Sequence, residues 1–359
     1  MAKLGDICTV VSGFTPKTGV AEYWDGTVKW ITPAELNEDS FYITDSVRHI
    51  TEDGKEKTGL SYLPKGTVIL SSRAPIGKTA IAGCEMCCNQ GFKNLICSDA
   101  VYNEYLYFFL KSKTNYLNSL GRGATFKEIS KSIVEKIEIP LPNIEKQHQI
   151  VKELKATRNL IAHRKQQLTK LDELIKARFV EMFGDPYTNS KDYPLKKGES
   201  FFKLSNGKAV PESKRLNGGI PAYGGNGISW YTDESLFDAD TIVVGRVGFQ
   251  SGNVHLVKGP LWVTDNAMYM SSCDFSQYNL TFLIELMAHV DFTKFQDAGD
   301  LKKITQKPFM QFEYLCPPLP LQNQFAAFVA EVDKSKVEVQ KALDQTQLLF
   351  DSLMQQYFG

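Results

Sequence analysis

Two stretches of the chain carry apolar residues at alternating steps of four and three, which is the heptad pattern of a long helix that packs against another helix. The first stretch predicts a helix over residues 146–182, with the seam positions Ile150, Leu154, Thr157, Ile161, Arg164, Leu168, Leu171, Ile175, Arg178 and Met182. The second predicts a helix over residues 325–357, with the seam positions Phe325, Val329, Val332, Lys336, Val339, Leu343, Thr346, Phe350, Leu353 and Tyr357. A Gly-Asp-Pro string at 184–186 predicts a sharp end for the first helix.

Each heptad stretch follows a Pro-rich hinge, and each hinge follows a segment with the pattern of β-strands. The hinges read IPLP at 139–142 and PPLP at 317–320. Before them, apolar strands end at Arg73 and at Arg246, and each is followed by a glycine turn, at Ile76-Gly77 and at Val247-Gly248. Pro140 and Pro318 are separated by about half the chain, so the sequence predicts an internal repeat in which Arg73 and Arg246 occupy equivalent places.

This order predicts an α+β fold with two β-rich domains separated by two long antiparallel coiled-coil helices, related by a pseudo-two-fold repeat. The predicted domains are residues 1–145 and 185–320, and the predicted helical segments are 146–184 and 321–359. An alternative interpretation packs each helix onto its own globular half without pairing the two helices.

Composition adds less than the pattern does. A length of 359 residues suits two domains. No apolar run reaches the roughly 18 residues of a membrane span, and the N-terminus lacks a secretory signal pattern. Seven cysteines, an odd number, favour reduced thiols, so we expect a cytoplasmic protein. The formal net charge is zero, whereas nucleic-acid binders usually carry a basic surplus. Any DNA-binding charge must therefore gather on one face or come from a partner.

The repeated order of β-rich segment, Pro-rich hinge, Gln-containing helix start and long helix resembles the specificity (S) subunit of type I restriction–modification systems. The strings that carry the resemblance are Lys3–Ile7, Ser72–Lys78, Asn89–Lys93, Ala222–Gly227 and Gly245–Gly248. The resemblance covers essentially the whole chain, and it depends on the order and repetition of these strings because no single one is decisive. The second hinge departs from the first, with Leu-Gln-Asn-Gln in place of Ile-Glu-Lys-Gln.

The resemblance implies a function as a DNA-binding, non-catalytic subunit. Each β-rich domain would be a target-recognition domain that reads one half of a bipartite site in double-stranded DNA, and the helices would set the spacing between the half-sites. Two methyltransferase subunits would dock and methylate adenine with S-adenosylmethionine, and separate restriction subunits that need ATP and Mg²⁺ would translocate and cleave DNA. This chain itself would need no cofactor and no metal, because base flipping and methyl transfer take place in the partner.

Residues suited to DNA contact are cations for phosphates and guanine, and amides for adenine. The two cations Arg122 and Lys127 belong to a predicted flexible loop, 121–127. For any single lysine among the candidates, the simpler interpretation is a solvated surface residue that does not contact DNA. Arg73 or Arg246 could instead brace a strand end by holding a carboxylate. The candidates in the first domain are Lys17, Ser72, Arg73, Lys78, Asn89, Gln90, Lys93, Arg122 and Lys127. In the second domain they are Lys208, Lys214, Arg215, Tyr223, Asn226, Arg246, Gln250, Asn253, Asn266, Lys302 and Lys303.

Other chemistry fits the sequence poorly. Residues 72–79 resemble a phosphate-binding loop without its first glycine, and a strand rather than a helix is expected next. The string at 184–187 lacks the second proline of an adenine methyltransferase motif, and the cysteines at 84–97 lack the partners of a zinc site. Two rival classes stay open: a self-contained DNA-modifying enzyme, and a coiled-coil adaptor that binds only proteins.

Overall fold

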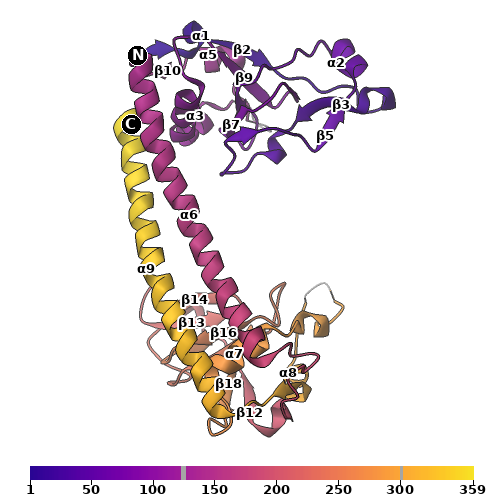
Figure 1. Cartoon of the computed structure of the whole chain (residues 1–359), viewed down its shortest axis with the longest axis vertical. Coiled ribbons are helices and arrows are strands. Elements are labelled where there is room, and N and C mark those ends of the chain that lie inside the picture. Colours follow the sequence, from indigo (N-terminus) through magenta and orange to yellow (C-terminus); the bar gives the residue numbers. More distant parts are fainter. Residues whose placement is uncertain (123–126, 300–301) are drawn as a thin grey trace. The chain divides into compact units, whose positions relative to one another are not determined.

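The computed structural model describes residues 1–122, 127–299 and 302–359. The chain folds as two compact units: unit 1 is Met1–Arg164 with Ala342–Gly359, and unit 2 is Lys165–Lys341. The two long helices, α6 (Ile144–Phe183) and α9 (Leu319–Phe358), are each shared between the units (Figure 1). Each unit therefore combines its own sheets with one part of α6 and one part of α9.

The described part of unit 1 contains three sheets, with the strand orders β2-β9-β6-β7-β4, β5-β3-β8 and β1-β10. The sheets are mostly antiparallel, but β3 pairs with β8 and β4 pairs with β7 in parallel. The strands are β1 (Ala2–Lys3), β2 (Cys8–Ser12), β3 (Trp24–Ile31), β4 (Tyr42–Ile43), β5 (Arg48–Ile50), β6 (Val68–Ser71), β7 (Thr79–Ala82), β8 (Cys87–Cys88), β9 (Phe92–Cys97) and β10 (Glu138–Ile139).

The described residues of unit 2 repeat this topology without a counterpart of β4. Its strand orders are β12-β18-β15-β16, β14-β13-β17 and β11-β19, and β13 and β17 pair in parallel as β3 and β8 do. The strands are β11 (Leu195–Lys197), β12 (Phe202–Asn206), β13 (Ile220–Gly224), β14 (Gly227–Thr232), β15 (Thr241–Gly245), β16 (Val254–Val257), β17 (Trp262–Val263), β18 (Ala267–Cys273) and β19 (Glu313–Leu315). The predicted internal repeat and the α+β fold class are confirmed.

One helix covers the main sheet of each unit, α3 (Asn103–Ser112) against β6 and β7 in unit 1, and α7 (Leu280–Ala288) against β15 and β16 in unit 2. Helix α3 buries Tyr105, Tyr107, Phe108 and Phe109, and α7 buries Phe282 among aliphatic residues, so both helices contribute to the core of their unit. The other helices are α1 (Leu4–Ile7), α2 (Glu52–Thr58), α4 (Thr114–Leu120), α5 (Lys131–Glu135) and α8 (Lys307–Gln311). Short 3-10 helices lie at Ala21–Tyr23, Pro33–Glu35, Gly198–Ser200, Glu212–Lys214 and Phe292–Phe295.

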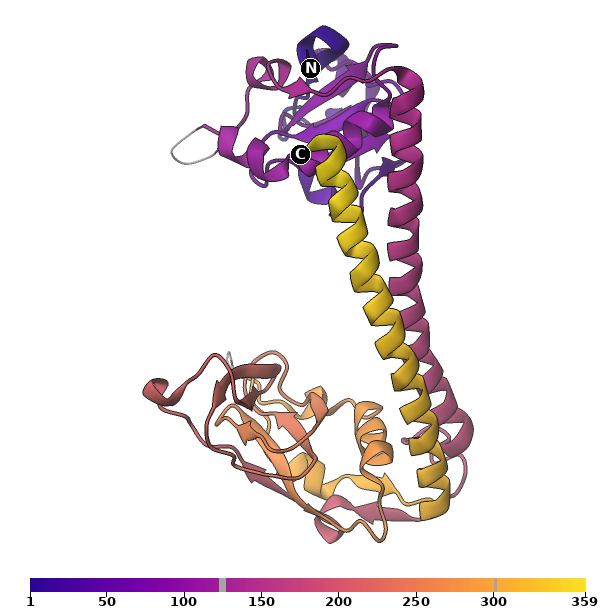
Figure 2. The same ribbon diagram turned by 90° about the vertical axis from the view of Figure 1, so that its left-hand side faces the viewer.

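Helices α6 and α9 lie side by side and run antiparallel within each unit (Figures 1 and 2). In unit 1, Tyr357 of α9 donates a hydrogen bond to Glu153 of α6, and Arg164 of α6 donates to the carbonyl of Ala342. In unit 2, Lys336 Nζ lies 2.6 Å from a carboxylate oxygen of Asp172. Every predicted seam position is buried or half-buried. The paired helices predicted from the heptads are therefore present, and the interpretation in which the helices do not pair is wrong.

A fully buried glutamine ties the start of α6 to unit 1. The side-chain oxygen of Gln147 accepts a hydrogen bond from the backbone N–H of Tyr102 at 2.8 Å. Its amide nitrogen donates to the carbonyls of Ala100 and Pro142 at 3.0 and 2.9 Å. One side chain thus joins the helix, the hinge and the segment that leads into α3, and both its amide nitrogen and its oxygen have hydrogen-bond partners.

Gln322 repeats this arrangement at the start of α9. It accepts from the N–H of Asn279 at 2.9 Å and donates to the carbonyls of Gln277 and Pro317 at 2.9 and 2.8 Å. Pro142 and Pro317 are therefore the structurally equivalent hinge residues, rather than the prolines at 140 and 318 that the sequence pattern suggested.

The first long helix ends where the sequence predicts. Gly184 adopts a φ of +75°, a backbone conformation that favours glycine, and its N–H bonds to the carbonyl of Val180 at 2.8 Å. The second long helix begins at Leu319, before the predicted position of 325, because Pro320 lies in the first turn, where a missing N–H breaks no helical hydrogen bond. The predicted domain boundaries at 145, 184 and 320 stay a prediction.

Candidate nucleic-acid interface

The loop between β6 and β7 and the loop between β15 and β16 are closed by corresponding backbone hydrogen bonds. In unit 1, the N–H of Ser71 bonds to the carbonyl of Lys78 at 2.8 Å, and Gly77 N–H bonds back to Ser71 at 3.1 Å. In unit 2, Gly245 bonds to Asn253 at 2.9 Å, and Gly252 bonds back to Gly245 at 2.8 Å. Gly77 and Gly252 both have positive φ angles, +95° and +99°. We call residues 72–78 and 246–253 the strand-end loops of units 1 and 2.

Hydrogen bonds to neighbouring segments identify which residues of the two strand-end loops are equivalent. Ser72 donates from its N–H to the carbonyl of Gly91 at 2.7 Å, and its own carbonyl accepts from Ile129 at 2.9 Å. Arg246 makes the matching bonds, to the carbonyl of Asn266 at 2.9 Å and from Ile304 at 3.0 Å. Arg246 is therefore the counterpart of Ser72.

The predicted equivalence of Arg73 and Arg246 is thus wrong by one residue. Arg73 forms an isolated β-bridge with Glu128, and Val247 forms the corresponding bridge with Lys303. The sequence pattern matched two arginines that precede a glycine, whereas the loop of unit 2 is one residue longer, and only the backbone pairing reveals the true register.

In unit 1, a carboxylate neutralises part of the positive charge at the strand-end loop. Glu128 accepts from Arg73 Nε at 2.9 Å and lies 3.2 Å from Lys93 Nζ. Burial alone would raise the pKa of the Glu128 carboxyl, but the hydrogen bonds from Arg73 and Lys93 outweigh it, and the pKa is lowered. Of the two roles that the sequence allowed for Arg73, contact with DNA and pairing with a carboxylate, the structure shows the second. The Arg73 side chain is still 45% exposed.

In unit 2, the corresponding position carries a cation. Lys303 takes the place of Glu128, and both Lys302 and Lys303 are exposed. Arg246 donates to the backbone carbonyl of Asp265 at 3.3 Å. Within residues 1–122, 127–299 and 302–359, the ion pairs include none of Arg246, Lys302 and Lys303. Arg246 also lines a pocket of about 440 Å³ with Asn206, Thr305, Gln306, Lys307 and Met310.

The remaining candidates of unit 1 are placed unevenly. Lys17, Arg122 and Lys127 are exposed, while residues 123–126 of their predicted loop lie outside the described residues. Ser72 and Lys93 are buried. Lys78, Asn89 and Gln90 are half-buried, and each contacts its own unit: Lys78 Nζ the carbonyls of Pro33 and Leu36, Asn89 the N–H of Gly91, and Gln90 the hydroxyl of Thr15.

In unit 2, the strand-end loop brings together the candidates Arg246, Gln250, Asn253, Asn266, Lys302 and Lys303. Other candidates lie on different segments. Lys208 and Asn226 are exposed, and Tyr223 is half-buried in β13. Lys214 pairs with Glu234 at 3.1 Å, and the Arg215 guanidinium lies 4.2 Å from the ring centre of Trp230.

The sequence analysis missed a second stacked arginine, Arg48 of β5. Its guanidinium lies 3.8 Å from the ring centre of Trp24, as that of Arg215 lies over Trp230. Stacking fixes a guanidinium while its N–H groups stay free to donate. In each unit, an exposed arginine therefore stacks on a tryptophan of the three-stranded sheet, Trp24 of β3 or Trp230 of β14, and the stacking is visible only in the tertiary structure.

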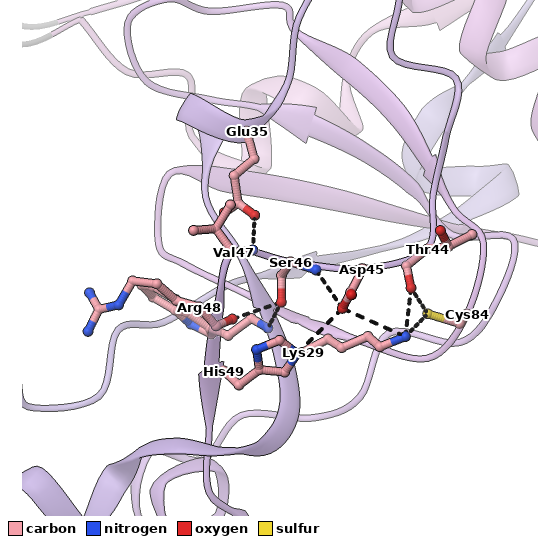
Figure 3. A network of polar contacts seen from close by, with 10 residues as sticks. Lys29, Glu35, Thr44, Asp45, Ser46, Val47, Arg48, His49 and Cys84 are labelled. Atoms are coloured by element: carbon pink, nitrogen blue, oxygen red, sulfur yellow. Dashed lines mark hydrogen bonds and ion pairs between the residues drawn. The ribbon is translucent and has the colours of Figure 1, made fainter.

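Polar contacts hold the loop before Arg48 in place (Figure 3). Lys29 Nζ donates to the carbonyl of Thr44 at 2.6 Å, and His49 Nε2 lies 3.4 Å from Asp45 Oδ1. A backbone hydrogen bond from Ser46 is the largest cause of a lowered pKa at Asp45. These contacts limit the movement of the β3–β5 edge that carries Arg48.

Across 1–122, 127–299 and 302–359, no group of three or more His, Cys, Asp or Glu side chains is placed to hold a metal ion. The seven cysteines are free thiols. A strand, β7, follows the phosphate-loop-like string, as expected. Within the same ranges, no helix combines the length and apolar character needed to cross a bilayer.

Two copies of one scaffold, with different side chains on equivalent loops, define a protein built by internal duplication. The family model for the type I restriction modification DNA specificity domain matches residues 1–173 and 191–346. The chain belongs to this family.

Individual relatives agree with the family match. The chain is 36% identical to the type I restriction enzyme MjaIX specificity subunit of Methanocaldococcus jannaschii over 263 residues. The matched region covers 72% of this chain and 58% of that protein. The chain is 22% identical over 354 residues to the EcoprrI specificity subunit of Escherichia coli, covering 92% and 86%. In fold, it resembles the crystal structure of a type I restriction–modification S subunit from M. genitalium, with a TM-score of 0.64, 16% identity, and coverage of 99% and 95%.

Proposed function

We propose that this chain reads a bipartite DNA target for a type I restriction–modification complex, with one half-site read by each unit. The observation that carries the proposal is the repeated scaffold with unlike loops. The same backbone position holds Glu128 in unit 1 and Lys303 in unit 2. Equivalent loops with different side chains suit the reading of two different short sequences, because base-edge hydrogen bonds depend on donor and acceptor type.

The surfaces proposed for DNA contact are the strand-end loops, with the exposed candidates around them and the two stacked arginines. Arg246, Lys302 and Lys303 supply cations in unit 2, and Lys17, Arg73 and Arg122 supply them in unit 1. Phosphate contacts by such cations fix position and register, and amides such as Asn226 and Asn266 are suited to base edges. Helices α6 and α9 would set the distance between the two reading surfaces.

Partner subunits supply the chemistry in this proposal. Two methyltransferase subunits would use S-adenosylmethionine, and restriction subunits would use ATP and Mg²⁺, while this chain is non-catalytic. Two equivalent leucines support the docking of two copies of one partner. Leu174 and Leu349 each lie nine residues before the end of their helix, and they are 46% and 52% exposed. Exposed leucines at matched positions give the same apolar contact twice.

A binding and methyl-transfer experiment separates this proposal from its rivals. The full chain is purified alone and together with a candidate adenine methyltransferase subunit, and each sample is tested by gel shift and by transfer of a labelled methyl group to DNA. We expect sequence-specific binding and transfer only with the partner. Methyl transfer by the chain alone would identify a self-contained enzyme, and assembly without DNA binding would identify an adaptor. Methylome sequencing then gives the two half-sites.

A further inference from the structure

Phe249 has the most exposed large apolar side chain among residues 1–122, 127–299 and 302–359, at 92% exposure. It lies in the strand-end loop of unit 2, between Gly248 and Gln250. A phenylalanine held in water forgoes the stabilisation that burial of its ring would provide. Its position, rather than exposure alone, indicates what would cover it.

The backbone around Phe249 is held in place. Gly248, with a φ of +98°, donates from its N–H to the carbonyl of Lys302 at 2.8 Å, and Ser251 N–H closes a turn onto Gly248 at 3.0 Å. Gln296 donates to the carbonyl of Ser251 at 2.6 Å. The ring therefore projects from the apex of a fixed turn, which lowers the entropy lost when the ring enters a binding partner.

Cations surround the base of this turn. Arg246 precedes it, and Val247 pairs with Lys303, next to Lys302. A surface that places an uncharged ring among three cations matches the duplex, in which phosphates flank stacked apolar bases. An apolar protein surface would gain nothing from these three charges.

Unit 1 lacks this feature at the equivalent loop. Between its matched positions, Arg73 and Gly77, lie Ala74, Pro75 and Ile76, none of them aromatic. The aromatic apex therefore belongs to unit 2 alone among these two loops.

We propose that Phe249 is an aromatic wedge that inserts between two base pairs of the half-site read by unit 2. This inference rests on the proposed function, in which unit 2 contacts DNA. Side chains that enter a base step unstack it and bend the duplex, and they favour steps that unstack easily. Unit 2 would then select its half-site partly by deformability, in addition to hydrogen bonds.

The test uses the complex of the full chain with its methyltransferase partner. The second half-site is taken as the one whose reading changes in Arg246→Ala. 2-Aminopurine, which fluoresces more strongly when unstacked, replaces one base at a time in that half-site, excluding the methylated adenine. We expect one position to brighten on binding with the wild type and with Phe249→Trp, and not with Phe249→Ala. Phe249→Ala should also weaken binding by roughly 5- to 140-fold.

Two control variants isolate the wedge. Phe275→Ala removes another exposed ring of unit 2, 60% exposed and located beyond the far end of β18, and it should change neither signal nor affinity. Lys303→Ala should lower the slope of log affinity against log salt by about one, whereas Phe249→Ala should leave this slope unchanged.

Three results would overturn the wedge. Wild-type affinity and fluorescence in Phe249→Ala would mean that the ring does not contact DNA. A loss in Phe249→Ala that uracil in place of thymine reproduces would assign the ring to a thymine methyl group. Loss of assembly with the methyltransferase would assign it to a protein contact. If the wild-type complex binds no specific DNA, the proposed function fails together with the wedge. If the wild-type complex binds specific DNA and one of the three results above is obtained, only the wedge fails.

Discussion

Replacing Gln147 with leucine should loosen the attachment of α6 to unit 1. The substitution keeps a side chain of similar size but removes three hydrogen bonds, those with Tyr102, Ala100 and Pro142. At about 0.5–1.5 kcal/mol for each bond, the expected loss is about 1.5–4.5 kcal/mol. Gln147→Glu should cost more, because a carboxylate would face two carbonyl oxygens.

Hydrogen–deuterium exchange of the full chain measures this loss locally. Since about 1.4 kcal/mol corresponds to a factor of ten, amides in residues 98–106 should exchange roughly ten- to a thousandfold faster in Gln147→Leu. Residues 275–283 should be unaffected, and Gln322→Leu should give the reverse pattern. Gln149→Leu, at an exposed position on the same helix turn, is the matched control. Unchanged exchange at 98–106 in Gln147→Leu would refute the role assigned to this buried amide.

Three further predictions concern the long helices, the strand-end loop of unit 2 and a buried carboxylate of unit 1. Inserting seven residues after Lys165, with a matching insertion after Lys341, adds about 10 Å of helix in register; the methylome should then show a spacer longer by roughly three base pairs and unchanged half-sites. Arg246→Ala should weaken or relax reading of the second half-site by about 1–3 kcal/mol in binding titrations, leaving the spacer length unchanged. Burial would raise the pKa of Glu104, but hydrogen bonds from Lys155 and Tyr42 lower it; the Glu104→Gln deficit in unfolding free energy should therefore be full at pH 7 and shrink below about pH 4.

Each of these predictions has a distinct contradicting result. Half-site bases that change with the insertion, or a spacer that changes with Arg246→Ala, would contradict the division between reading units and spacing helices. A Glu104→Gln deficit that grows as the pH falls would contradict the sign of the pKa shift, since a carboxyl with a lowered pKa stabilises the fold only while it is ionised.

The sequence alone predicted the features that repeat along the chain. The heptad seams identified both long helices because helical periodicity is local, and Gly184 marked a helix end because few residues adopt positive φ. The Pro-rich hinges and glycine turns exposed the duplication, and the order of these motifs indicated the family. The candidate site residues were chosen by residue type, which does not separate the buried Lys93 from the exposed Lys303.

The tertiary structure decided everything that depends on pairing between distant segments. Arg73 meets Glu128 across 55 positions, and Arg246 matches Ser72 only through the bonds of both to neighbouring strands. No periodicity encodes these relations, because sheet register and loop length set them jointly. The exposure of Phe249 was equally hidden, since phenylalanine is usually buried. The pattern along the chain therefore determined the scaffold, whereas the side chains that face a ligand were determined by how the strands come together.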